Sequence, residues 1–184
     1  KNGAWPCGEE WILEAWAESY LPLWELVEDL SSGAADGKLA LSLTPVLAEQ
    51  IEDPYLQERL AGYLANKVRQ AREEVIRLRG MGDKKRAEVA SYYAERYSEL
   101  LRKYHERFRG RMIRILAEAM AGGRVEVLAS AATHAHLPSL DYDACRMAQM
   151  RIGLEAYRER FRREPSGFWL PECGNYPGGE EYLK

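Results

Sequence analysis

Three short apolar segments, separated by long segments with the periodicity of amphipathic helices, constrain the fold most strongly. They span residues 38–45, 125–130 and 167–172. The first, KLALSLTP, carries apolar residues on both faces and ends at a proline, which is typical of a strand buried on two sides of a parallel sheet. Strands that alternate with helices pair in parallel through right-handed crossovers. The sequence therefore predicts an α/β fold, either an open sheet or a segment of a barrel.

The segments between these strands have helical periodicity and differ greatly in length. Helices are expected over residues 9–30, 46–79 (as two or three helices), 84–121 and 142–163. A bend is predicted near Pro22 in the first helix, and Tyr92 and Tyr93 are placed on the apolar side of the long third segment. Residues from about 46 to 121 are too many for one strand-and-helix unit of a barrel. We therefore expect a large helical insertion between the first two strands.

Composition and charge limit the class of partner. The 184 residues are 46% hydrophobic, enough for a globular domain with a real core. Twenty-six basic and 29 acidic residues give a net charge of -3, so the chain has no global positive field of the kind that nucleic-acid-binding proteins use. We expect no nucleic-acid partner.

The cysteines and the apolar runs bear on the compartment. Cys7, Cys145 and Cys173 are odd in number, far apart and without a CxxC pair, which argues against a disulfide framework and against a cysteine zinc site. No apolar run reaches the roughly 20 residues that span a bilayer, and the first residues lack the plan of a signal peptide. These features predict a cytoplasmic protein without a membrane anchor. Loop-like residues at one end and an unfinished helix at the other suggest part of a longer enzyme.

Polar residues follow each predicted strand, where α/β folds bind their ligands. Thr44, the segment 133–136 and Glu172 occupy these three positions. Glu172 follows the apolar residues 168–170, so we expect it to be partly desolvated, and a carboxylate is costly to bury without a partner. Glu172 is thus a candidate catalytic residue. The structural alternative is a glutamate that caps the next helix or pairs with an arginine.

Two histidines and one tryptophan are candidate ligand-binding residues. His134 and His136 could donate hydrogen bonds to substrate hydroxyls, supply two ligands to a metal, or be structural; alternation on an extended segment would put both rings on one side. Trp5 lies in a loop beside a proline. An exposed ring there could serve as a platform for the apolar face of a sugar.

Four segments resemble one enzyme family in the correct order. GFWLPECGNYPG resembles the nucleophile region of glycoside hydrolase family 57, and ATHAHLPSL resembles a second motif of that family. GAWPCGEEWILEAWAESYLPL and LSLTPVLAEQIEDPYLQERLAGYL are similar to the N-terminal segments of the family's 1,4-α-glucan branching enzymes. The similarity runs through nearly the whole chain.

This resemblance implies a fold, a reaction and roles for individual residues. The fold would be part of a (β/α)7 barrel, with residues 1–184 as a single, incomplete catalytic domain. The reaction would be retaining transglycosylation on amylose or glycogen, which cleaves α-1,4 and forms α-1,6 linkages, with no metal and no other cofactor. Glu172 matches the nucleophile, His134 a histidine that binds the sugar in the reacting subsite, and Trp5 a tryptophan near the substrate groove. His136 is a further candidate for binding substrate.

The chain departs from the family pattern in three ways. The family's first motif is absent, and its acid/base aspartate is expected beyond Lys184; Asp141 and Asp143 do not match it. His136, Ala135 and Asn175 replace residues that are usually aromatic, glycine and tyrosine. The alternatives are a family 57 amylase or 4-α-glucanotransferase, a catalytically silent glucan-binding fragment, and a metal-dependent carbohydrate hydrolase or deacetylase that uses both histidines.

Overall fold

The computed structural model describes residues 8–183 and divides the chain into two compact units. Unit 1 comprises residues 1–25 and 53–112, and unit 2 comprises residues 26–52 and 113–184. Trp5 lies outside the described residues. Within those residues, no helix combines the length and the apolar composition that crossing a membrane requires.

Unit 1 is helical. Its elements are α1 (Glu9–Ala15), the π-helical turn η1 (Trp16–Tyr20), the start of α2 (Leu21–Ser32), α4 (Pro54–Gly80), α5 (Lys84–Lys103) and a second π-helical turn, η2 (Tyr104–Phe108). The bend predicted near Pro22 coincides with η1. Because a proline ring collides with the carbonyl four residues earlier, the wider π turn directly before Pro22 relieves that collision.

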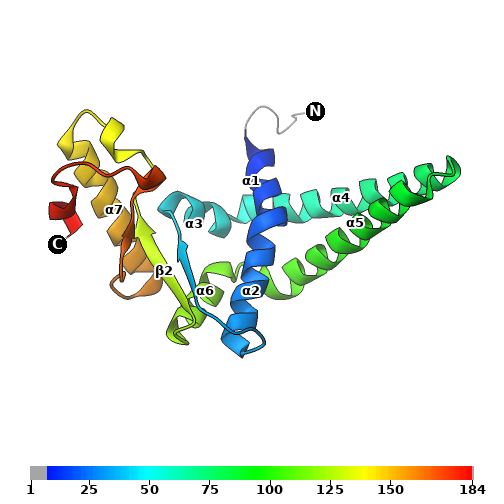
Figure 1. Cartoon of the computed structure of the whole chain (residues 1–184), viewed down its shortest axis with the longest axis horizontal. Helices are drawn as coiled ribbons and strands as arrows, with labels where there is room; N and C mark the ends of the chain where they lie inside the picture. The colour runs from blue at the N-terminus through cyan, green and yellow to red at the C-terminus, as the bar shows by residue number, and fades with distance from the viewer. Residues whose placement is uncertain (1–7, 184) are drawn as a thin grey trace. The chain divides into compact units, whose positions relative to one another are not determined.

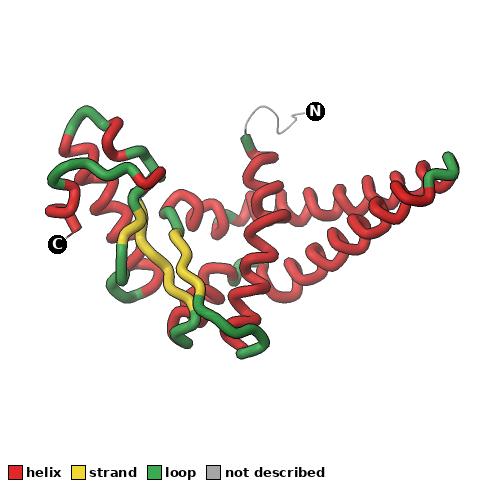
Figure 2. The backbone as a smooth tube through the Cα atoms, in the orientation of Figure 1, coloured by secondary structure: helices red, strands yellow, loops and turns green. Residues whose placement is uncertain are grey.

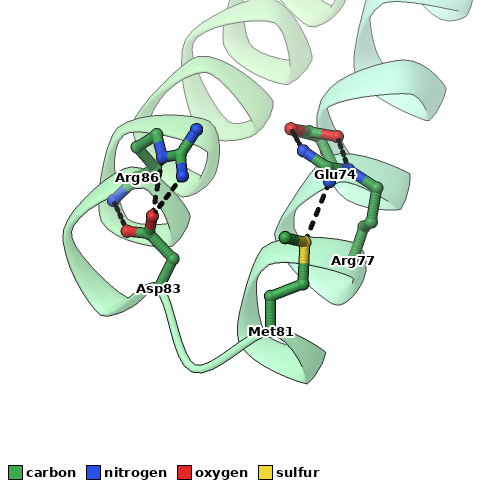
Figure 3. A network of polar contacts seen from close by, with 5 residues as sticks. All are labelled: Glu74, Arg77, Met81, Asp83 and Arg86. Atoms are coloured by element: carbon green, nitrogen blue, oxygen red, sulfur yellow. Dashed lines mark hydrogen bonds and ion pairs between the residues drawn. The ribbon is translucent and has the colours of Figure 1, made fainter.

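Helices α4 and α5 form a hairpin whose two arms lie side by side (Figures 1 and 2). At its tip Gly82 has a φ of 73°, a left-handed conformation that glycine adopts at little cost. The carboxylate of Asp83 accepts a hydrogen bond from the Arg86 backbone N–H, at 3.1 Å, and so caps α5 (Figure 3). This hydrogen bond holds the pKa of the Asp83 carboxyl below its ordinary value. At the end of α4, Arg77 donates to the sulfur of Met81 at 3.0 Å (Figure 3).

A comparable cap begins α4. Asp53 precedes Pro54, the first helical residue, and its carboxylate accepts from the Leu56 N–H at 2.8 Å. Replacement of Asp53 by alanine leaves this N–H without its partner and should lower the free energy of unfolding by about 1 kcal/mol. Urea unfolding measures the change, with Asp36→Ala, an exposed aspartate in a loop, as the control. Equal stability of the two variants would contradict the capping role.

The core of unit 1 forms around Trp16. Its ring is fully buried, its N–H donates to the Met112 sulfur at 3.0 Å, and it meets Tyr104 edge to face with centroids 6.5 Å apart. The Tyr104 hydroxyl donates to the Gln57 carbonyl at 2.9 Å, and burial raises the Tyr104 pKa. The polar groups of both buried rings therefore have partners, as a well-packed core requires.

The single helix expected over 84–121 is wrong. Helix α5 ends at Lys103, η2 follows, and Gly110, with a φ of 66°, lies in a turn before α6 (Met112–Ala121). The placement of Tyr92 and Tyr93 on the apolar side of this segment is also wrong, since their side chains are 57% and 42% exposed. The helical character of the insertion between the first two strands is nevertheless confirmed.

Unit 2 contains the sheet. Strands β1 (Leu39–Ser42), β2 (Val125–Ser130) and β3 (Phe168–Trp169) lie in the order β1-β2-β3, and both pairings are parallel (Figure 2). The predicted α/β class and parallel pairing are therefore confirmed. The prediction that β1 is buried on both faces is wrong, because Ala40 and Ser42 are exposed while Leu39 and Leu41 are partly buried.

The remaining elements of unit 2 are α3 (Pro45–Glu52), α7 (Asp143–Phe161) and the short 3-10 helices η3 (Leu137–Ser139), η4 (Pro171–Cys173) and η5 (Gly179–Leu183). Helix α7 packs against β2 (Figure 1). Ala131, Leu137 and Met150 form a buried cluster beside the end of β2, and Leu140, Phe168, Leu170 and Tyr176 pack around it. Five of these seven residues belong to the segments that follow β2 and β3, so the cluster anchors both segments.

Candidate active site

The segments that follow β2 and β3 bring two of the predicted site residues together. Because the strands are parallel and adjacent, their carboxyl ends lie at one edge of the sheet. There His134 Nε2 lies 3.5 Å from Glu172 Oε1. Among the residues that the structure describes, His134 is the partner of this carboxylate, rather than an arginine or a helix N-terminus. Thr44, after β1, instead caps α3 by accepting from the Leu47 N–H at 3.3 Å.

Both facing residues have unusual backbone conformations. The φ angles are 56° at His134, 52° at Glu172 and 55° at Cys173. A side chain in this left-handed region costs roughly 1–3 kcal/mol, and such residues gather at functional sites. Tight turns hold them: His134 N–H donates to Ala131 at 3.2 Å, and Cys173 N–H donates to Leu170 at 3.0 Å. The turns aim the imidazole and the carboxylate at each other.

The site is open in this chain. The Glu172 side chain is 73% exposed and the His134 side chain 39% exposed. The expected partial desolvation of Glu172 is therefore wrong here, because Phe168 and Leu170 pack against the buried cluster whereas the side chain of Glu172 projects outward. An exposed carboxylate is accessible to a substrate and can act as a nucleophile.

His136 contacts the turn that carries Glu172. Its Nδ1 lies 2.6 Å from the Ser139 hydroxyl. A Cβ built on Gly174 would lie 2.6 Å from Cδ2 of the His136 ring and 2.9 Å from Cδ of Pro138. The extended alternation assumed for the two histidines is also wrong, since His134 is left-handed. Within residues 8–183, no group of three His, Cys, Asp or Glu side chains is placed to bind a metal.

This packing predicts that residue 174 must be glycine. Gly174→Ala forces the His136 ring and Pro138 away from the nucleophile turn and should destabilise the fold by roughly 1–3 kcal/mol. His136→Ala removes one of the two colliding groups, so the double variant should recover part of that loss. Thermal unfolding of the single and double variants measures the coupling. Strictly additive losses would contradict the contact.

Two further groups at this edge have no signal in the strand pattern. Buried Ser130 donates from its hydroxyl to the Trp169 carbonyl at 3.0 Å and ties the ends of β2 and β3 together. On α7, the side chain of Gln149 bonds to Thr133, next to His134. The sequence offers one signal for a close approach of α7 to β2, which is Gly153, a glycine in the interior of α7.

The family model of glycosyl hydrolase family 57 matches residues 2–184. The chain belongs to this family. The 1,4-alpha-glucan branching enzyme of Thermococcus kodakarensis is 37% identical over 180 residues, which are 98% of this chain and 26% of that enzyme. The expected resemblance to family 57, with branching enzymes among the relatives, is confirmed.

Solved structures of a family 57 branching enzyme and of an α-amylase share this fold. The branching enzyme of Pyrococcus horikoshii has a TM-score of 0.85 at 36% identity, over 94% of this chain and 32% of that one. The α-amylase AmyC of Thermotoga maritima has a TM-score of 0.82 at 29% identity, over 95% and 33%. The family 57 chain described here therefore spans a third or less of the length of these relatives.

Proposed function

We propose that this chain forms the nucleophile-bearing part of a family 57 enzyme that branches α-glucans by retaining transglycosylation. The observation that carries the proposal is the approach of His134 to Glu172, at 3.5 Å, at the carboxyl edge of a parallel sheet. The 37% identity to a branching enzyme supports the choice of reaction. The substrate would be an α-1,4-glucan such as amylose or glycogen.

The reaction would proceed in two steps. The Glu172 carboxylate attacks the anomeric carbon, the α-1,4 bond breaks, and a covalent glycosyl-enzyme forms. His134, beside that carboxylate, donates a hydrogen bond to a hydroxyl of the same sugar. A glucan 6-hydroxyl then attacks the anomeric carbon, releases Glu172 and leaves an α-1,6 linkage.

The mechanism requires groups that the described residues do not supply. A retaining enzyme needs a second carboxyl group about 5–5.5 Å from the nucleophile, as proton donor and then base. We assign this second carboxyl group to the longer enzyme. Residues 1–184 would form one incomplete domain of its (β/α)7 barrel. Trp5 and His136 would border the glucan, with His136 contacting Gly174 as well.

Hydrolysis is the second candidate, because the α-amylase of Thermotoga maritima shares this fold. Water would then replace the 6-hydroxyl as acceptor at the same Glu172 intermediate. The two reactions leave different products. Transfer forms α-1,6 branches without a net gain of reducing ends, whereas hydrolysis forms one reducing end at each cleavage.

Incubation of the full-length protein with amylose tests the proposal. Debranching followed by chain-length analysis should reveal short chains that were absent from the substrate, with little increase in reducing ends. Reducing ends without branches would assign hydrolysis. Intact amylose that is nevertheless bound would show a glucan-binding protein without turnover.

A further inference from the structure

The turn that carries His134 is held by one side chain of helix α7. The Thr133 N–H donates to Gln149 Oε1 at 3.0 Å, and Gln149 Nε2 donates to the Thr133 hydroxyl at 3.0 Å. The backbone carbonyl of the same glutamine accepts from the Ala132 N–H at 3.0 Å. With a fourth hydrogen bond, from the Thr133 hydroxyl to Gln149 Oε1 at 3.2 Å, Gln149 fixes the two residues that precede His134.

The backbone of α7 leaves this contact little freedom to move. A Cβ built on Gly153, one turn after Gln149, would lie 2.0 Å from the Ser130 carbonyl oxygen. Met150, next to Gln149, is fully buried against Ala131 and Leu137. Helix α7 is therefore seated directly on the end of β2, and the reach of Gln149 to Thr133 is set by rigid elements.

We propose that Gln149 is a positioning residue, which keeps His134 in its left-handed conformation opposite Glu172. Gln149 acts through Thr133, the residue to which its side chain bonds. The role of Gln149 in catalysis rests on the proposed function, whereas the contact between Gln149 and Thr133 does not. Because a left-handed histidine costs roughly 1–3 kcal/mol, the turn needs fixed hydrogen bonds to keep the ring directed at Glu172.

The clamp uses both polar atoms of the Gln149 amide, because Oε1 accepts from the Thr133 N–H and hydroxyl and Nε2 donates to the same hydroxyl. An amide both accepts from the Thr133 N–H and donates to the Thr133 hydroxyl, whereas a carboxylate only accepts. Glutamate would therefore lose only the donation to the Thr133 hydroxyl and keep both acceptor contacts, whereas alanine would lose every side-chain contact with Thr133. Thr133 offers the complementary pair of variants: serine keeps the hydroxyl, and valine removes it with similar shape.

Histidine NMR tests the clamp without substrate or turnover. The chain has three histidines, His105, His134 and His136, so a ring ¹³C spectrum shows three signals, and His134→Asn identifies that of His134. At one fixed pH, Glu172→Gln should shift the His134 signal. In a Gln149→Ala background we expect that shift to fall on the order of threefold, because the ring no longer faces residue 172.

Matched variants separate positioning from general loosening of the fold. Gln70→Ala, at an exposed position on α4, should leave the shift unchanged, and Thr133→Ser should preserve it. Thr133→Val keeps the backbone N–H bond to Gln149 and should reduce the shift by less than Gln149→Ala does. Because Thr133 is exposed, this variant serves if Gln149→Ala fails to fold. The His105 signal, in unit 1, should not move in any of these variants.

Two results would overturn the inference. One is an undiminished response of His134 to Glu172→Gln in folded Gln149→Ala or Thr133→Val. The other is no response of His134 in the wild-type background. Branch formation from amylose by the full-length protein, together with either result, would leave the proposed function standing and remove only the role of Gln149.

Discussion

Among the glycines that the structure describes, Gly153 is the one whose replacement by alanine is expected to cost the most stability. The new Cβ would lie 2.0 Å from the carbonyl oxygen of Ser130 and 3.0 Å from its carbonyl carbon. Both obstacles are backbone atoms of β2, which cannot rotate away as a side chain can. Helix α7 must move off the sheet, so the free energy of unfolding should fall by about 3 kcal/mol or more.

Gly62→Ala is the matched control. Gly62 lies inside α4, and a Cβ built on it would have nothing within 4 Å. Alanine there should stabilise the chain by roughly 0.5–1 kcal/mol, because glycine loses more conformational freedom in a helix. Urea unfolding followed by circular dichroism measures both variants. A Gly153→Ala protein as stable as Gly62→Ala would show that α7 is not seated on β2.

Glu172→Gln is expected to abolish glycosyl transfer while the protein stays folded. The amide has almost the shape of the carboxylate but cannot form the glycosyl ester, so activity of the full-length protein should fall on the order of 10³-fold or more. The side chain is 73% exposed, so the fold should tolerate the change. Branch formation from amylose and thermal unfolding together measure the two effects.

Glu180→Gln is the control for this variant. Glu180 is an exposed glutamate further along the chain, in η5. Its replacement removes the same charge without touching the His134 contact, so activity should remain. Equal loss in both variants would mean that charge near this edge of the sheet, rather than Glu172 itself, supports the reaction.

The sequence predicts the sheet well and the helical insertion less well. Short apolar segments alternate with helices, and this pattern favours parallel pairing whatever the loops do. The break at Gly110 was missed because apolar periodicity continues on both sides of it, and a left-handed glycine leaves no trace in that period. The exposed face of β1 was missed because burial depends on what packs against a strand, which its own composition does not determine.

The residues of the candidate site also differ in how well the sequence predicts them. Glu172 and His134 could be found because each follows a strand, and parallel strands bring their carboxyl ends to one edge. Gln149 could not, since it is a polar residue on a helix and its partners are a backbone N–H and a hydroxyl of a distant turn. The left-handed backbone at His134 and Glu172 is likewise a property of the folded turns, not of these residue types.

The most direct test of the central claim is covalent trapping of the nucleophile with a 5-fluoro-α-glucosyl fluoride. Fluoride departs with little proton donation, so a competent nucleophile needs no acid partner for this first step, and the ring fluorine slows its release. Mass spectrometry of the digested protein should find the sugar esterified to Glu172, and no adduct in Glu172→Gln. A sugar attached to another carboxylate of this chain would contradict the assignment of Glu172.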